Sequence, residues 1–122
     1  MSTKHYRLIE LDNFSENLRR YFRRDEKRVR DKIKDMLETA PDRYDMLEGK
    51  ITVRGVKLAG LRRMKVGVQG YRGGAVVLYR ICEECLDNRY YEKSGTKCLF
   101  CKDDEREKVV LFDTYPRGHG YD

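Results

Sequence analysis

Hydrophobic and polar positions follow a helical period through the first third of the chain. Residues 14–22 place apolar side chains at the i, i+4, i+7 and i+8 spacing of one helical face, and residues 29–37 repeat it. Asp12 and Asn13 are typical capping residues, and Glu16 lies three positions after Asn13, as in a capping box. A very short break at residues 24–25 predicts an αα-hairpin, which ends at Pro41. The apolar positions are Phe14, Leu18, Tyr21, Phe22, Val29, Ile33, Met36 and Leu37.

Four further segments have the pattern of strands. They are residues 6–11, 61–68, 75–81 and 108–114. Three glycines within residues 69–74 suit a hairpin turn, because glycine reaches positive φ without steric cost. The order β-αα-β-β-β predicts an α+β fold, with the αα-hairpin packed on one face of an antiparallel sheet. We expect residues 1–122 to form a single domain.

The charge of the chain is basic and unevenly distributed. The 122 residues include 27 Lys and Arg against 21 Asp and Glu, and residues 1–81 alone carry a net charge of +9. A field of that sign attracts polyanions, nucleic acid first among them, although a solvated surface of mixed charge is the plain alternative. No apolar run approaches the roughly 18–20 residues of a membrane span, and the N-terminus has no apolar signal segment. These features predict a cytoplasmic protein that does not bind membranes.

Cations dominate the polar faces of the αα-hairpin. Glu26 with Arg30 and Lys34 with Glu38 can pair at i, i+4, but the remaining cations leave one basic surface. We therefore expect an RNA-binding surface there. Its candidate residues are Arg23, Arg24, Lys27, Arg28 and, from the glycine-rich segment, Tyr71.

All four cysteines fall into two CxxC pairs. The pairs are Cys82–Cys85 and Cys98–Cys101, with twelve residues between them. Each pair can present two thiolates to one metal ion, so the pattern predicts one structural zinc ion in a closed Cys₄ site. Disulfides and a redox-active CxxC are the alternatives. We expect residues 82–101 to form a small zinc ribbon, inserted between two strands of the domain.

Several short motifs resemble those of the RelE/ParE toxin superfamily. The resemblance covers nearly the whole chain apart from residues 82–101, and three segments carry it: residues 58–67, residues 77–81 and the tail, residues 117–121. Arg63 and Lys65 match the family's basic pair, and Tyr79 matches the last tyrosine of its strand motif. The resemblance implies a toxin of a toxin–antitoxin system, an endoribonuclease that cleaves mRNA in a ribosomal context. It also implies a cognate antitoxin protein and contact with rRNA.

The sequence departs from the family pattern at one position. An arginine is expected three residues before Tyr79, where this chain has Val76, and Arg72 is the candidate replacement. This departure favours the alternative of a ParE-like toxin, or a zinc-stabilised RNA-binding module, that does not cleave RNA.

RNA cleavage without a metal ion uses the ribose 2′-OH as the nucleophile. The reaction needs a base at that hydroxyl, cations around the phosphorane and an acid for the leaving 5′-oxygen. Lys65 is the candidate base, and His119 is the candidate acid or base near neutral pH. The remaining candidates are Arg63, Arg72 and Arg117 for the phosphorane, and Tyr121 or Tyr71 to stack on or orient a base. Each of these residues also has a plain interpretation as a solvent-exposed side chain.

Overall fold

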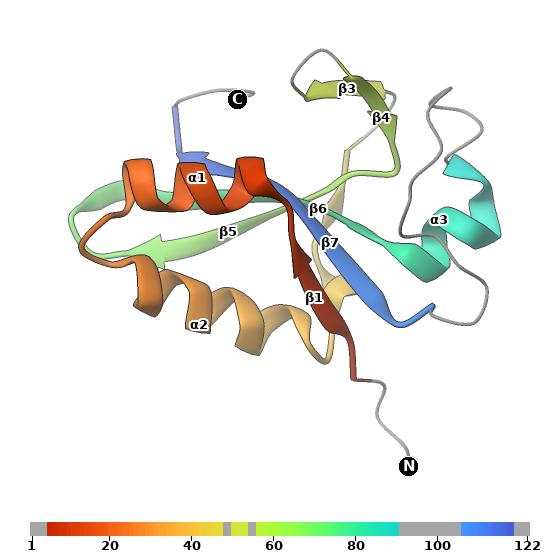
Figure 1. Cartoon of the computed structure of the whole chain (residues 1–122), viewed down its shortest axis with the longest axis horizontal. Helices are drawn as coiled ribbons and strands as arrows, with labels where there is room; N and C mark the ends of the chain where they lie inside the picture. Colours follow the sequence, from red (N-terminus) through yellow and green to blue (C-terminus); the bar gives the residue numbers. More distant parts are fainter. Residues whose placement is uncertain (1–4, 48–49, 54–55, 91–105, 119–122) are drawn as a thin grey trace.

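The computed structural model describes residues 5–47, 50–53, 56–90 and 106–118 (Figure 1). It confirms the α+β fold, with the N-terminal helices packed on a five-stranded sheet. The elements in chain order are β1 (Arg7–Glu10), α1 (Asp12–Tyr21), α2 (Glu26–Leu37), the 3₁₀ turn η1 (Pro41–Arg43), β2 (Asp45–Met46), β3 (Lys50–Val53), β4 (Val56–Ala59), β5 (Arg62–Val68), β6 (Tyr71–Ile81), α3 (Cys82–Asn88) and β7 (Lys108–Pro116). No helix in the described ranges has the length and apolar content needed to cross a membrane.

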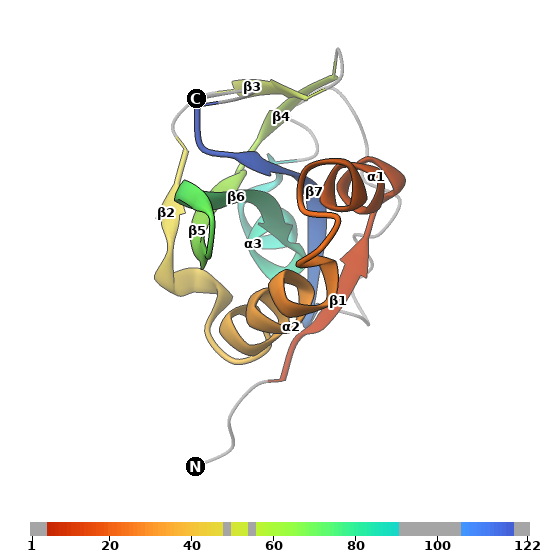
Figure 2. The same ribbon diagram turned by 90° about the vertical axis from the view of Figure 1, so that its left-hand side faces the viewer.

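The sheet is mixed, so the prediction of an antiparallel sheet is wrong at one strand. The strand order is β1-β7-β6-β5-β2, and β1 runs parallel to β7 while the other pairs are antiparallel. The period-2 pattern shows which side chains face the core, but it does not specify strand direction. The sequence analysis also missed β2 and the separate β3–β4 hairpin, which lies on the side of the sheet away from α2 (Figure 2).

The main core lies between the two helices and the sheet. Phe14 and Leu18 of α1 and Ile33 of α2 are almost fully buried against residues of β5, β6 and β7. Both predicted helices are present with the predicted buried faces. The first turn of α1 differs from the prediction, because Leu11 occupies the N-cap position and no side chain caps the helix. Asn13 instead donates to the Phe112 carbonyl at 3.4 Å, so it tethers α1 to β7.

The β5–β6 hairpin has a shorter turn than predicted. Val68 pairs with Tyr71 across the two residues 69–70, whereas the next pair along the hairpin is Val66 with Ala75. Residues 72–74 of β6 therefore lie opposite the single residue Gly67, and the pairing register shifts there as in a β-bulge. Arg72 consequently belongs to a strand and not to a loop.

We expect Gly74→Ala to destabilise this hairpin strongly. Gly74 has a φ of +72°, and an added Cβ would lie 2.1 Å from the Val66 carbonyl oxygen. A strained residue of this kind costs about 1–3 kcal/mol before the clash is counted. Gly67→Ala is the matched control, because its Cβ would meet no atom within 4 Å and its φ is unstrained. Urea unfolding should show that Gly74→Ala lowers the free energy of unfolding by about 3 kcal/mol and Gly67→Ala by under about 0.5 kcal/mol. Equal losses would contradict the bulge geometry.

Candidate functional site

Arg63 and Lys65 lie on the face of β5 that points away from α1 and α2. The residues between and after them, Met64 and Val66, are buried in the main core, so alternation places the two cations on the opposite face. Lys65 is exposed and Arg63 is half-buried. The structure thus places the basic pair on one face of a strand, as the sequence analysis expected.

The surface beside Lys65 is apolar. Lys65 pairs with Val76 on β6, and Val76 pairs with Tyr115 on β7. Val76 is completely buried and forms a second apolar cluster with Leu61, Leu78 and Tyr115. The position where the RelE/ParE pattern expects an arginine is therefore a packing position here, and any replacing guanidinium must come from another residue.

Arg117 lies against the bulge of β6, next to the position of Arg72. The Arg117 N–H donates to the Gly74 carbonyl at 3.2 Å. An added Cβ at Gly73 would lie 2.6 Å from Cδ of Arg117, so the arginine side chain covers this glycine. Both arginines are exposed. Arg117 lies two residues beyond Tyr115, and Tyr115 lies two strands from Lys65. The Cα atoms of Arg117 and Lys65 are therefore roughly 12 Å apart, within the combined reach of two long side chains. His119 and Tyr121, the other candidates of the tail, lie outside the described residues.

The α1–α2 turn forms a second basic feature, which we call the arginine hollow. It is a surface hollow of about 640 Å³ lined by Arg20, Tyr21, Arg23, Arg24 and Tyr71. The predicted RNA-binding residues Arg23 and Arg24 belong to it, whereas Lys27 and Arg28 are exposed on α2 outside it. Arg20 was not among the RNA-binding candidates, because its position at the hollow depends on the contact of α1 with the distant Tyr71.

Tyr71 joins the β5–β6 hairpin to the α1–α2 turn. Its hydroxyl donates to the Tyr21 carbonyl at 2.6 Å, and its ring lies 4.8 Å from the ring of Phe22 at a 56° tilt. The Lys32 ammonium adds a second link by donating to the Gly67 carbonyl at 2.8 Å. The described contacts of Tyr71 are therefore those of a packing residue that fixes the two basic features relative to each other.

Half of the predicted zinc site lies in α3. Cys82 and Cys85 occupy the first turn of this helix, so a ribbon over residues 82–88 was the wrong expectation. Their i, i+3 spacing puts both thiols on one helical face, and each cysteine is 1% exposed. Cys98 and Cys101 lie outside the described residues. The described ranges alone hold no group of three His, Cys, Asp or Glu side chains that could bind a metal ion.

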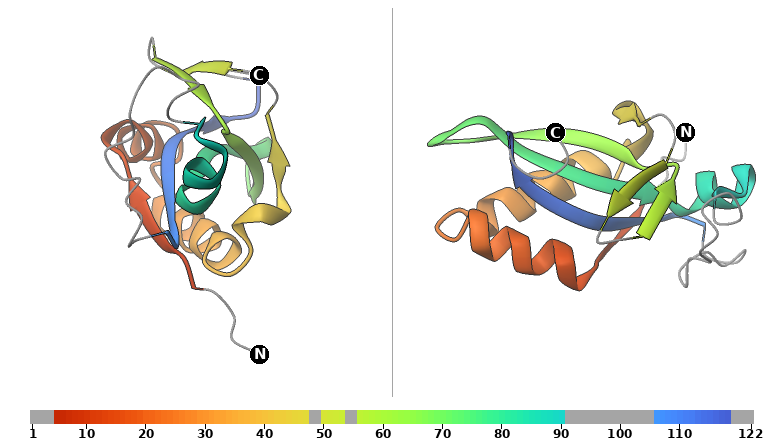
Figure 3. Two further views of the ribbon diagram at one scale, coloured as in Figure 1. Left: turned by 90° about the vertical axis from the view of Figure 1, so that its right-hand side faces the viewer. Right: turned by 90° about the horizontal axis from the view of Figure 1, so that it is seen from above.

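Two carboxylates of α3 attach the helix to the sheet. Glu84 accepts two hydrogen bonds from Arg62, at 2.8 Å and 2.5 Å, and Arg62 also donates to the Tyr44 carbonyl at 2.6 Å. Glu83 accepts a hydrogen bond from the Tyr6 hydroxyl. The Glu84 hydrogen bonds raise the pKa of Arg62, while burial and then the Glu83 hydrogen bond raise the pKa of Tyr6. These contacts fix α3 at the end of the sheet opposite the α1–α2 turn (Figure 3).

We expect Glu84→Gln to lower the free energy of unfolding by about 2 kcal/mol. The change removes a charged partner from Arg62, whose side chain is only 12% exposed, and breaking such a pair leaves an uncompensated charge. Glu38→Gln is the matched control. Glu38 lies 3.8 Å from the exposed Lys34 and 3.5 Å from the exposed His5, and surface pairs of this kind contribute about 0.5 kcal/mol each. Guanidinium unfolding of both variants measures the difference, and similar losses would show that α3 does not depend on Arg62.

The described residues define an α+β domain with two connected basic surfaces. Four cations lie on or beside the outer face of β5, β6 and β7, and three arginines line the hollow at the α1–α2 turn. Such surfaces are typical of proteins that bind polyanions. The chain matches no protein-family model, no curated protein and no solved structure.

Proposed function

We propose that this chain is a RelE-like endoribonuclease, the toxin of a toxin–antitoxin system in the cytoplasm, which cleaves ribosome-associated mRNA. The observation that supports this proposal most is the cationic face formed by Arg63, Lys65, Arg72 and Arg117. Arg63 and Lys65 come from β5, Arg72 comes from the β6 bulge, and Arg117 follows the end of β7. These strands are neighbours in the sheet, which brings the four cations close together.

The residues of this face fit a cleavage in which the 2′-OH attacks the adjacent phosphate. Lys65 in its neutral amine form accepts the proton of the 2′-OH and becomes an ammonium, and the arginines stabilise the charge that develops on the phosphorane oxygens. His119 gives a proton to the leaving 5′-oxygen, since its imidazole exchanges protons near neutral pH. The products are a 2′,3′-cyclic phosphate and a free 5′-hydroxyl.

The alternative is a ParE-like toxin or RNA-binding module that does not cleave RNA. The buried Val76 favours it, because the position next to Lys65 contributes packing instead of a guanidinium. Arg72 and Arg117 favour cleavage, because they supply two guanidinium groups near the row of Lys65. Arg117 lies two residues beyond Tyr115 of that row, and Arg72 lies four residues before Val76, across the bulge.

We also propose that Cys82, Cys85, Cys98 and Cys101 hold one structural zinc ion. The two described cysteines fit this role, because their thiols lie on one face of a helix turn and are shielded from solvent. Four thiolates would complete a closed tetrahedral site, which contributes folding free energy and leaves no position for a substrate.

The proposed antitoxin is a protein that covers the cationic face. An acidic segment would complement Lys65, Arg72 and Arg117, and it would exclude RNA from the same surface.

The test is cleavage of mRNA on programmed ribosomes by the purified chain. We expect cuts with 2′,3′-cyclic phosphate ends, which the cognate antitoxin prevents. A protein that arrests growth but cuts no RNA would contradict the enzymatic proposal and support the alternative.

A further inference from the structure

The arginine hollow contains three cations with no carboxylate partner. Other arginines of the same helices are paired: Arg19 with Glu26 at 3.3 Å, Arg30 with Glu10 at 2.8 Å, and Arg28 more loosely with Asp25 at 4.0 Å. Within the described part of the chain, by contrast, none of Arg20, Arg23 and Arg24 forms an ion pair.

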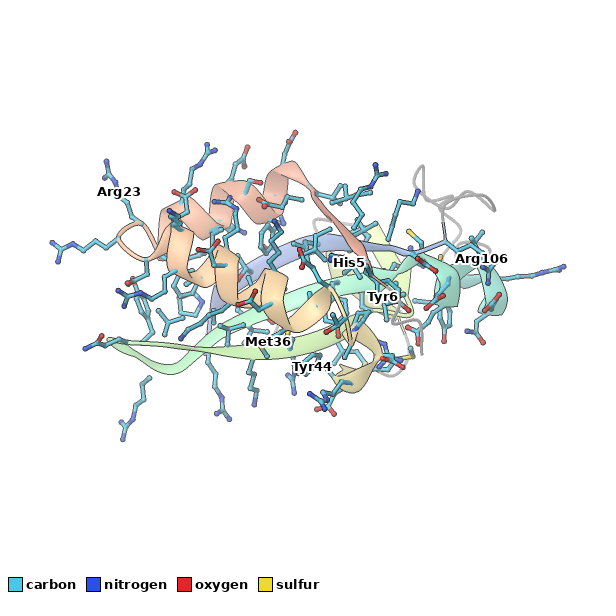
Figure 4. All side chains as sticks on the ribbon, turned by 90° about the horizontal axis from the view of Figure 1, so that it is seen from below. His5, Tyr6, Arg23, Met36, Tyr44 and Arg106 are labelled. Carbon is cyan, nitrogen blue, oxygen red and sulfur yellow. The ribbon has the colours of Figure 1, made fainter. Side chains whose placement is uncertain are left out.

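Concentrating three like charges around one hollow is unfavourable unless an anion binds there. The three arginines are exposed and fall within five residues of the helix end and turn. Figure 4 shows Arg23 at one extreme of the molecule, with Arg106 at the other, so a large ligand can approach this end without obstruction by the described elements. Guanidinium groups bind phosphate and carboxylate oxygens with two parallel N–H donors, so the phosphates of a nucleic-acid backbone fit the hollow.

The tyrosines of the hollow do not present a free stacking surface. The Tyr71 hydroxyl is used by the Tyr21 carbonyl and its ring packs near Phe22, while Tyr21 packs against both apolar clusters. Recognition at the hollow therefore depends on charge and not on base identity, which is how proteins bind nucleic-acid backbones without sequence preference.

The hollow and the cationic face lie on opposite sides of β6 and meet round the end of the β5–β6 hairpin, because Tyr71 packs toward the helices whereas Lys65 points away from them. Tyr71 lines the hollow, Arg72 follows it, Arg117 covers Gly73, and Val76 lies beside Lys65. Val68 and Lys65, the partners of Tyr71 and Val76 on β5, are three residues apart, so the two positions of β6 are about 10 Å apart along the strand. That length corresponds to at least about three nucleotides at the axial rise of one helical strand.

We infer that the arginine hollow is a second RNA site, which binds backbone phosphodiesters and is continuous through Arg72 and Arg117 with the face that carries Lys65. The inference rests on the proposed function for the choice of RNA as the polyanion. It adds a non-catalytic subsite, with Arg20 as one of its ligands, that holds the RNA strand at least about three nucleotides from Lys65.

The test compares two triple variants with the same loss of charge. Arg20→Gln/Arg23→Gln/Arg24→Gln changes the hollow, whereas Arg7→Gln/Lys34→Gln/Arg43→Gln removes three exposed cations from β1, the end of α2 and η1. The probe is a fluorescent 12-nucleotide 2′-O-methyl RNA, which cannot be cleaved because it lacks the 2′-OH nucleophile. Fluorescence anisotropy over a range of salt concentrations gives the affinity and its salt dependence.

We expect the hollow variant to bind the 12-mer at least about tenfold more weakly at low salt. Its slope of log K against log salt should be shallower by about 2, because three phosphate contacts of a single strand are lost. The control variant should lose less than about threefold, since its charges are remote and screened. The wild type should also prefer the 12-mer to a trinucleotide, which cannot span both sites, and the hollow variant should lose most of this preference.

Equal losses in the two triple variants would overturn the inference, because the hollow would then act only through net charge. Cleavage on programmed ribosomes separates this outcome from failure of the proposed function. If the wild type cuts mRNA but the hollow variant binds the 12-mer as tightly as the control variant does, the second site is contradicted and the endoribonuclease is not. A wild type that binds the 12-mer through the hollow but cuts nothing overturns the endoribonuclease and leaves the second site in place.

Discussion

Cys85→Ser is expected to release one zinc ion per chain and to lower Tm by at least about 10 °C. Cys85 is 1% exposed in the first turn of α3, beside Cys82 and the two carboxylates that attach the helix to Tyr6 and Arg62. Loss of a structural metal removes several kcal/mol of folding free energy, and in a domain of this size each kcal/mol shifts Tm by about 3–5 °C. Elemental analysis and differential scanning calorimetry measure the two effects.

Cys98→Ser tests whether the second CxxC pair binds the same metal ion. If all four thiolates share one zinc ion, this variant should lose the metal and as much stability as Cys85→Ser, and the double variant should be no worse. A strong chelator should lower the Tm of the wild type to that of the variants and leave the variants unchanged. A metal-free wild type with a mass two hydrogens lighter per cysteine pair would instead show disulfides and contradict the zinc site.

The helices could be predicted from the sequence because their signal is local. Phe14, Leu18, Ile33 and Leu37 recur at the period of the helix, and the period alone identifies the face that becomes buried. The predicted capping box is absent because α1 begins at Asp12, so Asn13 lies inside the helix, where its side-chain amide donates to the Phe112 carbonyl 99 residues away. A capping motif reports only local preference, whereas the tertiary contact decides which hydrogen bond forms.

The sheet was predictable only in part for the same reason. Its strands follow from alternation, but the parallel pairing of β1 with β7 joins segments from opposite ends of the sequence, which no local pattern specifies. The three glycines within residues 69–74 correctly predicted a hairpin between two strands. They could not show that Gly74 belongs to a bulge instead of a loop, since a positive φ occurs in both.

The candidate site, too, was predictable only where its signal is local. Alternation places Arg63 and Lys65 on one face of β5, and this required no knowledge of the fold. The approach of Arg117 to the β6 bulge and the position of Arg20 at the arginine hollow both depend on contacts between distant segments. The Arg62–Glu84 pair was missed because two charged residues 22 positions apart have no recognisable spacing.

Lys65→Ala is expected to slow mRNA cleavage by about 10²–10⁴-fold, the range for loss of a general acid–base group. The change also removes a cation from the phosphorane, so its effect should equal or exceed that of His119→Ala. Lys65 is exposed on β5, so Tm should shift by no more than about 2 °C. Lys34→Ala is the matched control, since it removes an equally exposed lysine from α2, far from the cationic face.

The distribution of effects among the variants identifies the group that donates the proton. Single-turnover cleavage on programmed ribosomes should keep its rate in Lys34→Ala and lose it in Lys65→Ala and His119→Ala, while antitoxin binding persists in all three. If His119→Ala cuts normally and Tyr121→Phe is inactive, the acid is the tail tyrosine and the assignment of His119 is wrong. If Lys65→Ala cuts normally while Arg72→Ala does not, the cation beside the bulge carries the reaction, and the basic pair of β5 only binds RNA. Val76 leaves the position next to Lys65 without a guanidinium, so Arg72 has to supply it. Arg72→Ala should therefore slow mRNA cleavage at least about tenfold whichever group donates the proton, a loss that a plain solvent-exposed arginine would not produce.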